Sequence, residues 1–479
     1  METGTGPDTF DPHMAQVDVE VRNARDSWTR LVTKRATGRP RPCREKPRSR
    51  SQISRHRERC CSILTPSRFA LSFPRRRTQA IVSQYTGHGL LSRLVFVAKK
   101  AAEKGDETLE LDALKVAFDE AKKVEHTALY KEVTEMIRGR CGQEYLCDTT
   151  WVEQVDRRTA QKQDKLESEL NGYKANLIKE SIRMGHTFLG EFFYEKGDLS
   201  AALKCYIRTR DYCTTSKHVI TMCLNVIKVS LELENYLHVL NYVQKGEVSP
   251  QVQEDPGTVD KLKCAAGLAN LANGKYKIAA RKFLEVSADC KYSEVIAPQE
   301  VATYGAFCAL ASFDRSELKQ KVIDSVSFRN LLELVPQVRE VVNDFYASRY
   351  ASCLRMLDGL RTHLEYDLYL HKHIKELTMQ IREKAIVQYT IPFTSVVLEN
   401  MARAFNTDVD ALEKEIANLI ANGQIHARVD SHNKLLYSRG INQRSSTFQR
   451  VVKAGKDCLR DSQAILLRAR LLESGLISK

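Results

Sequence analysis

Proline is scarce over most of this chain. The 479 residues include 12 prolines, of which seven lie at or before Pro74, and the next is Pro250. Proline lacks the amide hydrogen and clashes with the preceding turn, so helix interiors exclude it. The 175 residues between these two prolines are rich in Leu, Ala, Lys and Glu, which favour helix. The distribution therefore predicts a mainly helical body.

Long apolar runs are also missing. No uncharged apolar stretch approaches the roughly 20 residues that span a bilayer, and the N-terminus has no apolar signal-peptide core. The 13 cysteines are scattered, so we interpret them as buried free thiols of a reducing compartment. We expect a soluble, intracellular protein that does not contact membranes.

Motifs for catalysis and cofactor binding are absent as well. The sequence has no phosphate-binding loop, nucleophile elbow or His-Glu-x-x-His motif. His371 and His373 form the one close histidine pair, but residues two apart on a helix point about 200° apart. No Ser-x-x-Asp follows to complete a metallopeptidase site, and Cys141 and Cys147 lack a second ligand pair. We expect no enzyme activity, metal or cofactor; a peptidase with an unusual zinc site is the alternative.

Basic charge is concentrated in one segment. The net charge is +14, yet residues 22–77 alone carry 18 Lys or Arg against three acids, which leaves the rest of the chain at −1. We expect residues 1–84 to form a disordered tail, because arginines and turn formers occur there without apolar periodicity. In one interpretation, this tail binds RNA or carries a nuclear import signal at Arg75–Arg77. In the other it is solvated and has no specific partner.

Helical periodicity begins near Tyr85 and predicts an N-terminal helical region over residues 85–180. Leu114, Ala117, Phe118 and Ala121, for example, recur at the spacing of one helix face.

A repeated pattern of small and aromatic residues follows within residues 181–388. Gly190, Gly197, Ala202 and Tyr206 each have a counterpart 77 residues later, and a weaker copy between them gives a period of about 38, near the tetratricopeptide unit. Small residues let paired helices approach closely, and the aromatic residue fills the gap to the next pair. The pattern favours stacked pairs with a concave binding face over a bundle with coincidental spacing. The counterparts are Gly267, Gly274, Ala279 and Phe283.

Residues 389–440 have the order helix, turn, helix, β-hairpin, which is typical of a winged helix. We expect a helix over 396–405, a second one capped by Asp410 and Glu413, and strands over 424–430 and 434–438, where apolar and polar residues alternate.

The second helix of this module is acidic. It carries Asp408, Asp410, Glu413 and Glu415 against Lys414, and this excess of carboxylates repels DNA phosphates. We therefore expect the hairpin edge to bind protein rather than duplex DNA. The predicted interface residues are His426, Arg428, Asp430, Lys434 and Leu436.

Residues 441–479 are predicted to form one helix with an apolar seam at heptad spacing. The seam either docks into a multi-helix bundle or packs on its own domain. Its residues are Val451, Val452, Cys458, Leu459, Ile465, Leu466 and Leu472.

The predicted fold is all-α: a tetratricopeptide-like superhelix, a winged-helix module and a C-terminal helix. This order resembles the PCI-domain family, which includes subunits of the proteasome lid, the COP-nine signalosome and translation initiation factor three. Three tracts are similar to the subunit-one family of the signalosome, and the similarity runs from about Tyr85 to the C-terminus. They are NGYKANLIKESIRMGH (171–186), GDLSAALKCY (197–206) and ARVDSHNKLLY (427–437).

The resemblance implies a non-catalytic scaffold that supports removal of a ubiquitin-like modifier from cullins by a different, metal-dependent subunit. It implies hairpins that pair edge to edge and C-terminal helices that gather in a bundle. The implied partners are other PCI subunits, the metalloprotease subunit and, indirectly, cullin-RING ligases, in the cytoplasm and nucleus. The Arg-rich tract departs from the family before Tyr85. The alternatives are a PCI subunit of the proteasome lid or of an initiation factor, and an RNA-binding factor that acts through residues 22–77.

Overall fold

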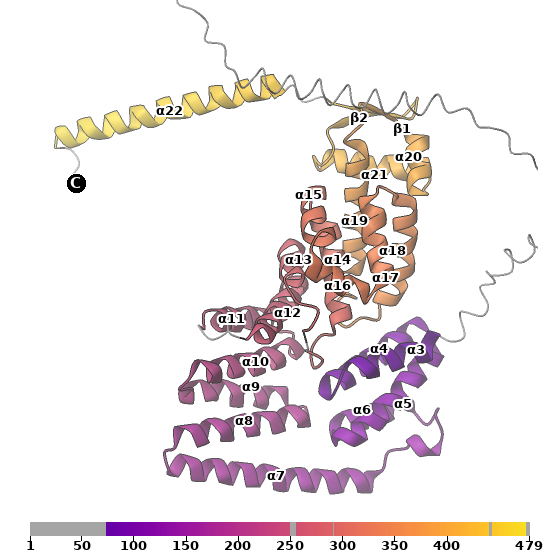
Figure 1. Cartoon of the computed structure of the whole chain (residues 1–479), viewed down its shortest axis with the longest axis vertical. Helices are drawn as coiled ribbons and strands as arrows, with labels where there is room; N and C mark the ends of the chain where they lie inside the picture. The colour runs from indigo at the N-terminus through magenta and orange to yellow at the C-terminus, as the bar shows by residue number, and fades with distance from the viewer. Residues whose placement is uncertain (1–72, 250–254, 291, 440–442, 476–479) are drawn as a thin grey trace, which may run out of the picture. The chain divides into compact units, whose positions relative to one another are not determined.

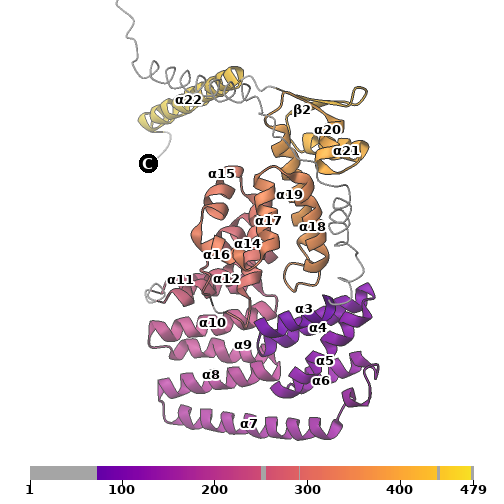
Figure 2. The same cartoon turned by 45° about the vertical axis from the view of Figure 1, so that its right-hand side comes forward.

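The computed structural model describes residues 73–249, 255–290, 292–439 and 443–475, and Figures 1 and 2 show it in two orientations. The predicted fold class is confirmed: helical repeats precede a small winged-helix module and a long last helix. Every described cysteine is free, although Cys147 and Cys458 are exposed rather than buried. In this part of the chain no helix combines the length and apolarity that crossing a bilayer requires.

In the part of the chain that the structure describes, five helices precede the repeats, and α3 lies before the predicted start at residue 85. Helix α3 lies within the range predicted as a disordered tail, so that boundary is corrected to residue 72; residues 1–72 lie outside the described residues. Thr78 and Tyr85 are buried and Ile81 packs on the same core, a helical spacing that the neighbouring arginines obscure. The helices are α3 (Phe73–Gln84), α4 (His88–Lys104), α5 (Glu107–Val124), α6 (Thr127–Ile137) and α7 (Thr149–Ala175), with a 3-10 turn at Gln143–Tyr145.

Three helical hairpins follow, and α7 to α11 lie in successive layers in both views (Figures 1 and 2). Each hairpin turns through a residue with positive φ: Gly197, Glu234 or Gly274. Glu234 takes the glycine position in the middle copy, which explains why that copy was faint in the sequence. The helices are α8 (Lys179–Lys196), α9 (Leu199–Arg208), α10 (Ser216–Glu232), α11 (Tyr236–Glu247), α12 (Pro256–Ala272) and α13 (Tyr276–Leu284), with a 3-10 turn at Thr209–Tyr212 after α9.

Helix α14 is the central core helix of the next part. Its residues from Val301 to Leu310 are all buried, and it contacts α13, α16, α17 and α19. A helix buried on every side needs a continuous apolar sequence. The elements are α14 (Pro298–Ser312), α15 (Arg315–Leu318), a π-helical turn (Lys319–Ile323), α16 (Val326–Glu333), α17 (Pro336–Tyr346), α18 (Tyr350–Leu364) and α19 (Ile374–Thr390).

The winged-helix module contains a third strand that the sequence did not predict. Val396 and Val397 were assigned to a helix, but they lie in β1 and pair with Leu436 and Leu435 of β3. Paired β-branched residues favour a strand, and here the partner strand comes from 40 residues later. The sheet is antiparallel, in the order β1-β3-β2. The elements are β1 (Ser395–Val397), α20 (Leu398–Phe405), α21 (Val409–Ala421), β2 (Ala427–Asp430) and β3 (Leu435–Ser438).

One hydrophobic core runs from the repeats into the winged helix. A single cluster of buried residues extends from Tyr194 to Leu436, and a second one holds α3 to α6 together with the start of α7. Because the core is continuous, the repeats and the winged-helix module are packed as one body. The last helix, α22 (Gln443–Glu473), has 31 residues.

Candidate functional site

The five predicted hairpin residues have different environments. His426 and Arg428 are exposed, and Ala427 between them is buried, which is the alternation expected for a half-buried strand. Leu436 is only 2% exposed and belongs to the core. Its assignment to a protein interface was therefore wrong: the central strand β3 turns this side chain inward.

Lys434 is held by two carboxylates of α21. Its Nζ lies 2.9 Å from Asp410 Oδ1 and 2.8 Å from Glu413 Oε2, and these carboxylates raise the pKa of Lys434 above its ordinary value. Helix α21 begins at Val409 without a side-chain cap. The predicted capping by Asp410 and Glu413 is thus wrong, because the two acids hold the hairpin against the helix instead.

Asp430 fixes the hairpin turn. Its carboxylate accepts hydrogen bonds from the amides of His432 and Asn433, at 3.1 and 3.3 Å, and from Asn433 Nδ2 at 2.9 Å. Lys434 completes the turn with a φ of 51°. Of the five predicted residues, His426 and Arg428 are therefore the two whose side chains are exposed and carry no such internal role.

Among the described residues, no strand pairs with the outer side of β2, which is an edge of the sheet. Arg439 N–H donates to His426 C=O at 2.8 Å, so the backbone groups of His426 and, two residues later, Arg428 face β3. The backbone groups of Ala427 and Val429 face the other way. An edge of this kind is a template for a strand from another chain.

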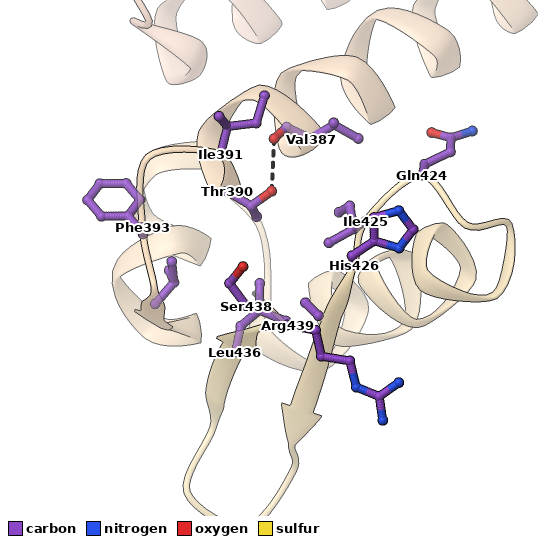
Figure 3. A pocket seen from close by; sticks show the side chains of 12 residues that line it. Val387, Thr390, Ile391, Phe393, Gln424, Ile425, His426, Leu436, Ser438 and Arg439 are labelled. Atoms are coloured by element: carbon purple, nitrogen blue, oxygen red, sulfur yellow. Dashed lines mark hydrogen bonds between the residues drawn. The ribbon is translucent and has the colours of Figure 1, made fainter. Parts of the chain in front are cut away.

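A hollow of about 580 Å³ lies between the end of α19 and the sheet (Figure 3). Ile391 and Phe393, on the linker after α19, line one side of it. His426 and Arg439, at the ends of the strands, line the other. The hollow adjoins the residues that lead into β2.

The seam of α22 is exposed along its length. Val451, Leu459, Ile465 and Leu466 are between 62% and 69% exposed, Val452 and Leu472 are 39% exposed, and Cys458 is exposed too. Phe448, which is 69% exposed, extends the seam by one turn at the i, i+4 spacing from Val452. The sequence interpretation missed it, although helical spacing indicates it.

In each of two repeat hairpins, a glycine of the first helix packs against an aromatic ring of the second. A Cβ on Gly190 of α8 would lie 2.7 Å from the Tyr206 ring of α9, and one on Gly267 of α12 would lie 2.5 Å from the Phe283 ring of α13. The prediction that the ring fills the gap to the next helix pair is therefore wrong: the ring occupies the space of the missing side chain within its own hairpin. Ala202 and Ala279 are fully buried, and Gly197 and Gly274 form the turns.

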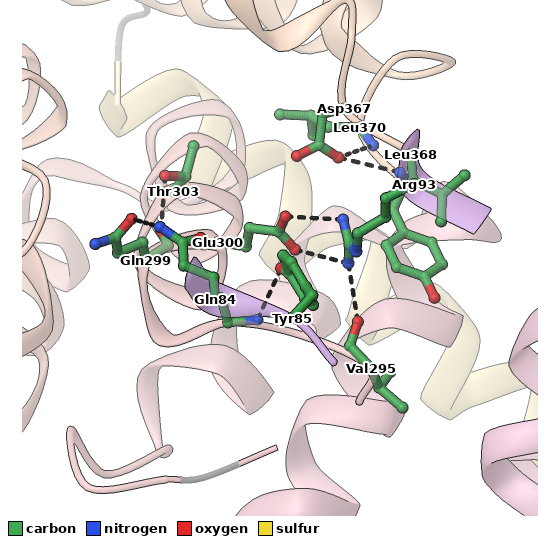
Figure 4. A network of polar contacts seen from close by, with 12 residues as sticks. Gln84, Tyr85, Arg93, Val295, Gln299, Glu300, Thr303, Asp367, Leu368 and Leu370 are labelled. Carbon is green, nitrogen blue, oxygen red and sulfur yellow. Dashed lines mark hydrogen bonds and ion pairs between the residues drawn. The ribbon is translucent and has the colours of Figure 1, made fainter. Parts of the chain in front are cut away.

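A buried polar network joins α4 to α14 (Figure 4). The Arg93 guanidinium contacts Glu300 Oε1 and Oε2 at 2.8 and 2.9 Å and donates to Val295 C=O at 2.8 Å. The Tyr85 ring lies 4.0 Å from the guanidinium carbon. Burial raises the pKa of Glu300 to about 7, although the charge of Arg93 opposes this shift.

The network continues to the turn before α19. Tyr304 Oη donates to Asp367 Oδ1 at 2.5 Å, and Asp367 accepts from the amides of Tyr369 and Leu370 at 3.0 Å. Nothing in the sequence indicated this network, because Arg93 and Glu300 are 207 residues apart. It fixes the N-terminal helices to the core helix.

The two histidines considered as metal ligands lie within hydrogen-bond distance of other protein groups instead. His371 Nδ1 lies 2.9 Å from Leu368 C=O, and His373 Nδ1 lies 3.2 Å from Tyr276 Oη. Cys141 and Cys147 are free. Among the described residues, no three metal-binding side chains come together.

Comparisons with family models and with known proteins agree with this architecture. The PCI-domain model matches residues 350–439, and the model of 26S proteasome subunit RPN7 matches residues 148–321. COP9 signalosome complex subunit 1 of Arabidopsis thaliana is 54% identical over 397 residues, or 82% of this chain and 89% of that protein. Its counterpart in Emericella nidulans is 34% identical over 423 residues, or 84% and 83%.

A proteasome relative is more distant. The 26S proteasome non-ATPase regulatory subunit 6 homolog of Arabidopsis thaliana is 24% identical over 322 residues, which cover 66% of this chain and 82% of that protein.

Proposed function

This chain belongs to the family of COP9 signalosome subunit 1, and we propose that it acts in that complex as a non-catalytic scaffold. In this role it assembles with other PCI subunits and supports the metalloprotease subunit that removes a ubiquitin-like modifier from cullins of cullin-RING ligases. The higher identity to the signalosome relatives favours this assignment over a proteasome-lid subunit. We place its action in the cytoplasm and nucleus.

The exposed seam of α22 carries the proposal. A 31-residue helix with a continuous row of exposed apolar side chains is unfavourable in water unless another surface covers that row. The heptad spacing fits helices that pack side by side. We infer that C-terminal helices of neighbouring subunits cover it.

The edge of β2 supplies the second contact. Its outward backbone groups at Ala427 and Val429 accept a strand from a neighbouring subunit, and the exposed side chains of His426 and Arg428 lie beside them. The continuous core between the repeats and this module supports a rigid scaffold, because it holds the edge in a fixed place relative to the repeats.

The test is native mass spectrometry of complexes co-purified with the full chain. Leu459→Asp combined with Leu466→Asp places two charges in the seam, and we expect partner subunits to be lost. Ala464→Asp adds a charge on the opposite, exposed face and serves as the control. An unchanged set of subunits with the seam variant would contradict the proposal.

A further inference from the structure

A second hollow lies on the other side of the linker between α19 and β1. Its volume is about 650 Å³, within the range of ligand pockets. Tyr350, Tyr389 and Phe393 line its apolar walls. Their rings are held in place: Tyr350 stacks on Phe405 at a centroid distance of 5.3 Å, and Tyr389 lies 5.6 Å from Phe393.

Two cations line this hollow and make no ion pair with the described residues. Lys384 donates to Phe313 C=O, and Arg315 donates to Ser348 Oγ at 3.2 Å and Tyr346 C=O at 2.7 Å. These acceptors are neutral, so neither cation has a carboxylate within ion-pair distance among the described residues, although Asp314 and Glu317 act on Lys384 from farther away. Asp314 is the one carboxylate in the lining. Burial lowers the pKa of Lys384 to about 8, so the amine is still mostly protonated at neutral pH.

Two apolar residues of the linker that line this hollow are exposed. Ile391 is 74% exposed and Phe393 is 46% exposed, and both also line the hollow beside the sheet (Figure 3). The two hollows therefore flank the same linker residues, and together we call them the linker groove. Arg315 and Lys384 lie in one half of it, and Arg439 lies in the other.

We propose that this linker groove binds an acidic peptide segment of a partner protein, one that carries large apolar side chains between its carboxylates. The carboxylates supply close ion-pair partners for Arg315 and Lys384, and the apolar side chains cover Ile391 and Phe393. A purely apolar peptide leaves the cations unpaired, and a basic peptide is repelled. Arg315, Lys384 and Phe393 belong to neither the β2 edge nor the α22 seam, so variants of these three residues test the groove separately from the scaffold contacts.

Fluorescence anisotropy with the full chain tests the groove. The probe is fluorescein-labelled Gly-Asp-Glu-Phe-Asp-Leu-Asp-Glu, with two control peptides: one has Asn and Gln for the acids, the other Ala for Phe and Leu. We expect the probe to bind more tightly than either control. Arg315→Gln, Lys384→Gln and Phe393→Ala should each weaken binding roughly tenfold, the size of one lost charged or apolar anchor.

Lys414→Gln is the matched control, since Lys414 is an exposed cation of α21 outside the groove. It should change the affinity less than about twofold. Arg315 is exposed, so its variant remains informative if Lys384→Gln unfolds the protein, which circular dichroism reveals. Failure of the probe to bind, wild-type affinity in both cation variants, or equal binding of the Ala peptide overturns the proposal. Competition by N-acetylphenylalanine at the affinity of the probe would assign the groove to a small aromatic acid and also overturn it.

Discussion

The ring of Tyr206 lies directly on the backbone of Gly190, where a Cβ would come within 2.7 Å of its Cε1 atom. The same contact recurs between Phe283 and Gly267 in the last hairpin of the repeats. The glycine lets the second helix of a hairpin bring an aromatic ring against the first. The spacing of small and aromatic residues in the sequence reflects this contact.

Alanine at Gly190 should destabilise the protein despite the higher helix propensity of alanine. The added methyl overlaps the ring, and overpacking of a core costs about 1–3 kcal/mol. Gly359→Ala is the matched control, because Gly359 is also helical but a Cβ added there would meet no atom within 4 Å. It should stabilise by up to about 1 kcal/mol. Denaturant titrations of both variants measure the difference, and effects of the same sign would contradict this packing.

Proline at Val429 should abolish edge pairing while the module stays folded. The Val429 N–H faces away from β3, so its removal spares the hairpin and withdraws one donor from an added strand. We expect affinity for a neighbouring PCI subunit to fall roughly tenfold, as measured by titration of the purified subunits. Arg428→Pro is a poorer probe, because that N–H faces β3. Unchanged affinity of a folded Val429→Pro variant would rule out pairing at this edge.

The stability of the chain should depend on pH through Glu300. Its folded-state pKa of about 7 lies above the ordinary value of 4.5. The native state therefore retains a proton that the unfolded state loses between these pH values. The free energy of unfolding then falls as pH rises from 4.5 to 7, by about 3 kcal/mol for this group.

Glu300→Gln should remove this contribution, because glutamine does not titrate. Denaturation of both proteins at pH 5 and pH 7.5 measures it, with Glu399→Gln, which alters a 63% exposed side chain, as the control. The same pH dependence in wild type and Glu300→Gln would show that Glu300 does not titrate in this range.

The basic segment should bind RNA only through charge, if it binds RNA at all. Residues 22–77 have a net charge of +15 and the rest of the chain −1. Filter binding by the full chain should weaken on the order of 10³-fold between roughly 50 and 200 mM salt if six phosphate contacts form. A chain without residues 1–72 should lose this binding. Retention of RNA affinity by the shortened chain would move the site into the helical body.

The sequence by itself determined the helical class, the repeated small residues, the hairpin and the apolar seam of the last helix. These features depend on local periodicity: a helix face repeats every three to four residues and a strand face every two. The repeat of Gly197 at Gly274 was legible from its spacing and the alternation around Ala427 from its period of two, but the role of the two glycines in turns appeared only in the structure. The start of α3 was missed because arginines diluted the same periodicity.

The tertiary structure decided the features that depend on contacts between residues distant in sequence. The pairing of Arg93 with Glu300, the strand made by Val396 and Val397, the burial of Leu436 and the binding of Lys434 by Asp410 and Glu413 each depend on a partner distant in sequence. A charged or apolar residue looks the same in the sequence whether its side chain contacts water, the hydrophobic core or another charge. The choice is made only when the packed backbone brings a particular partner within about 3 Å for a polar contact, or removes the side chain from water.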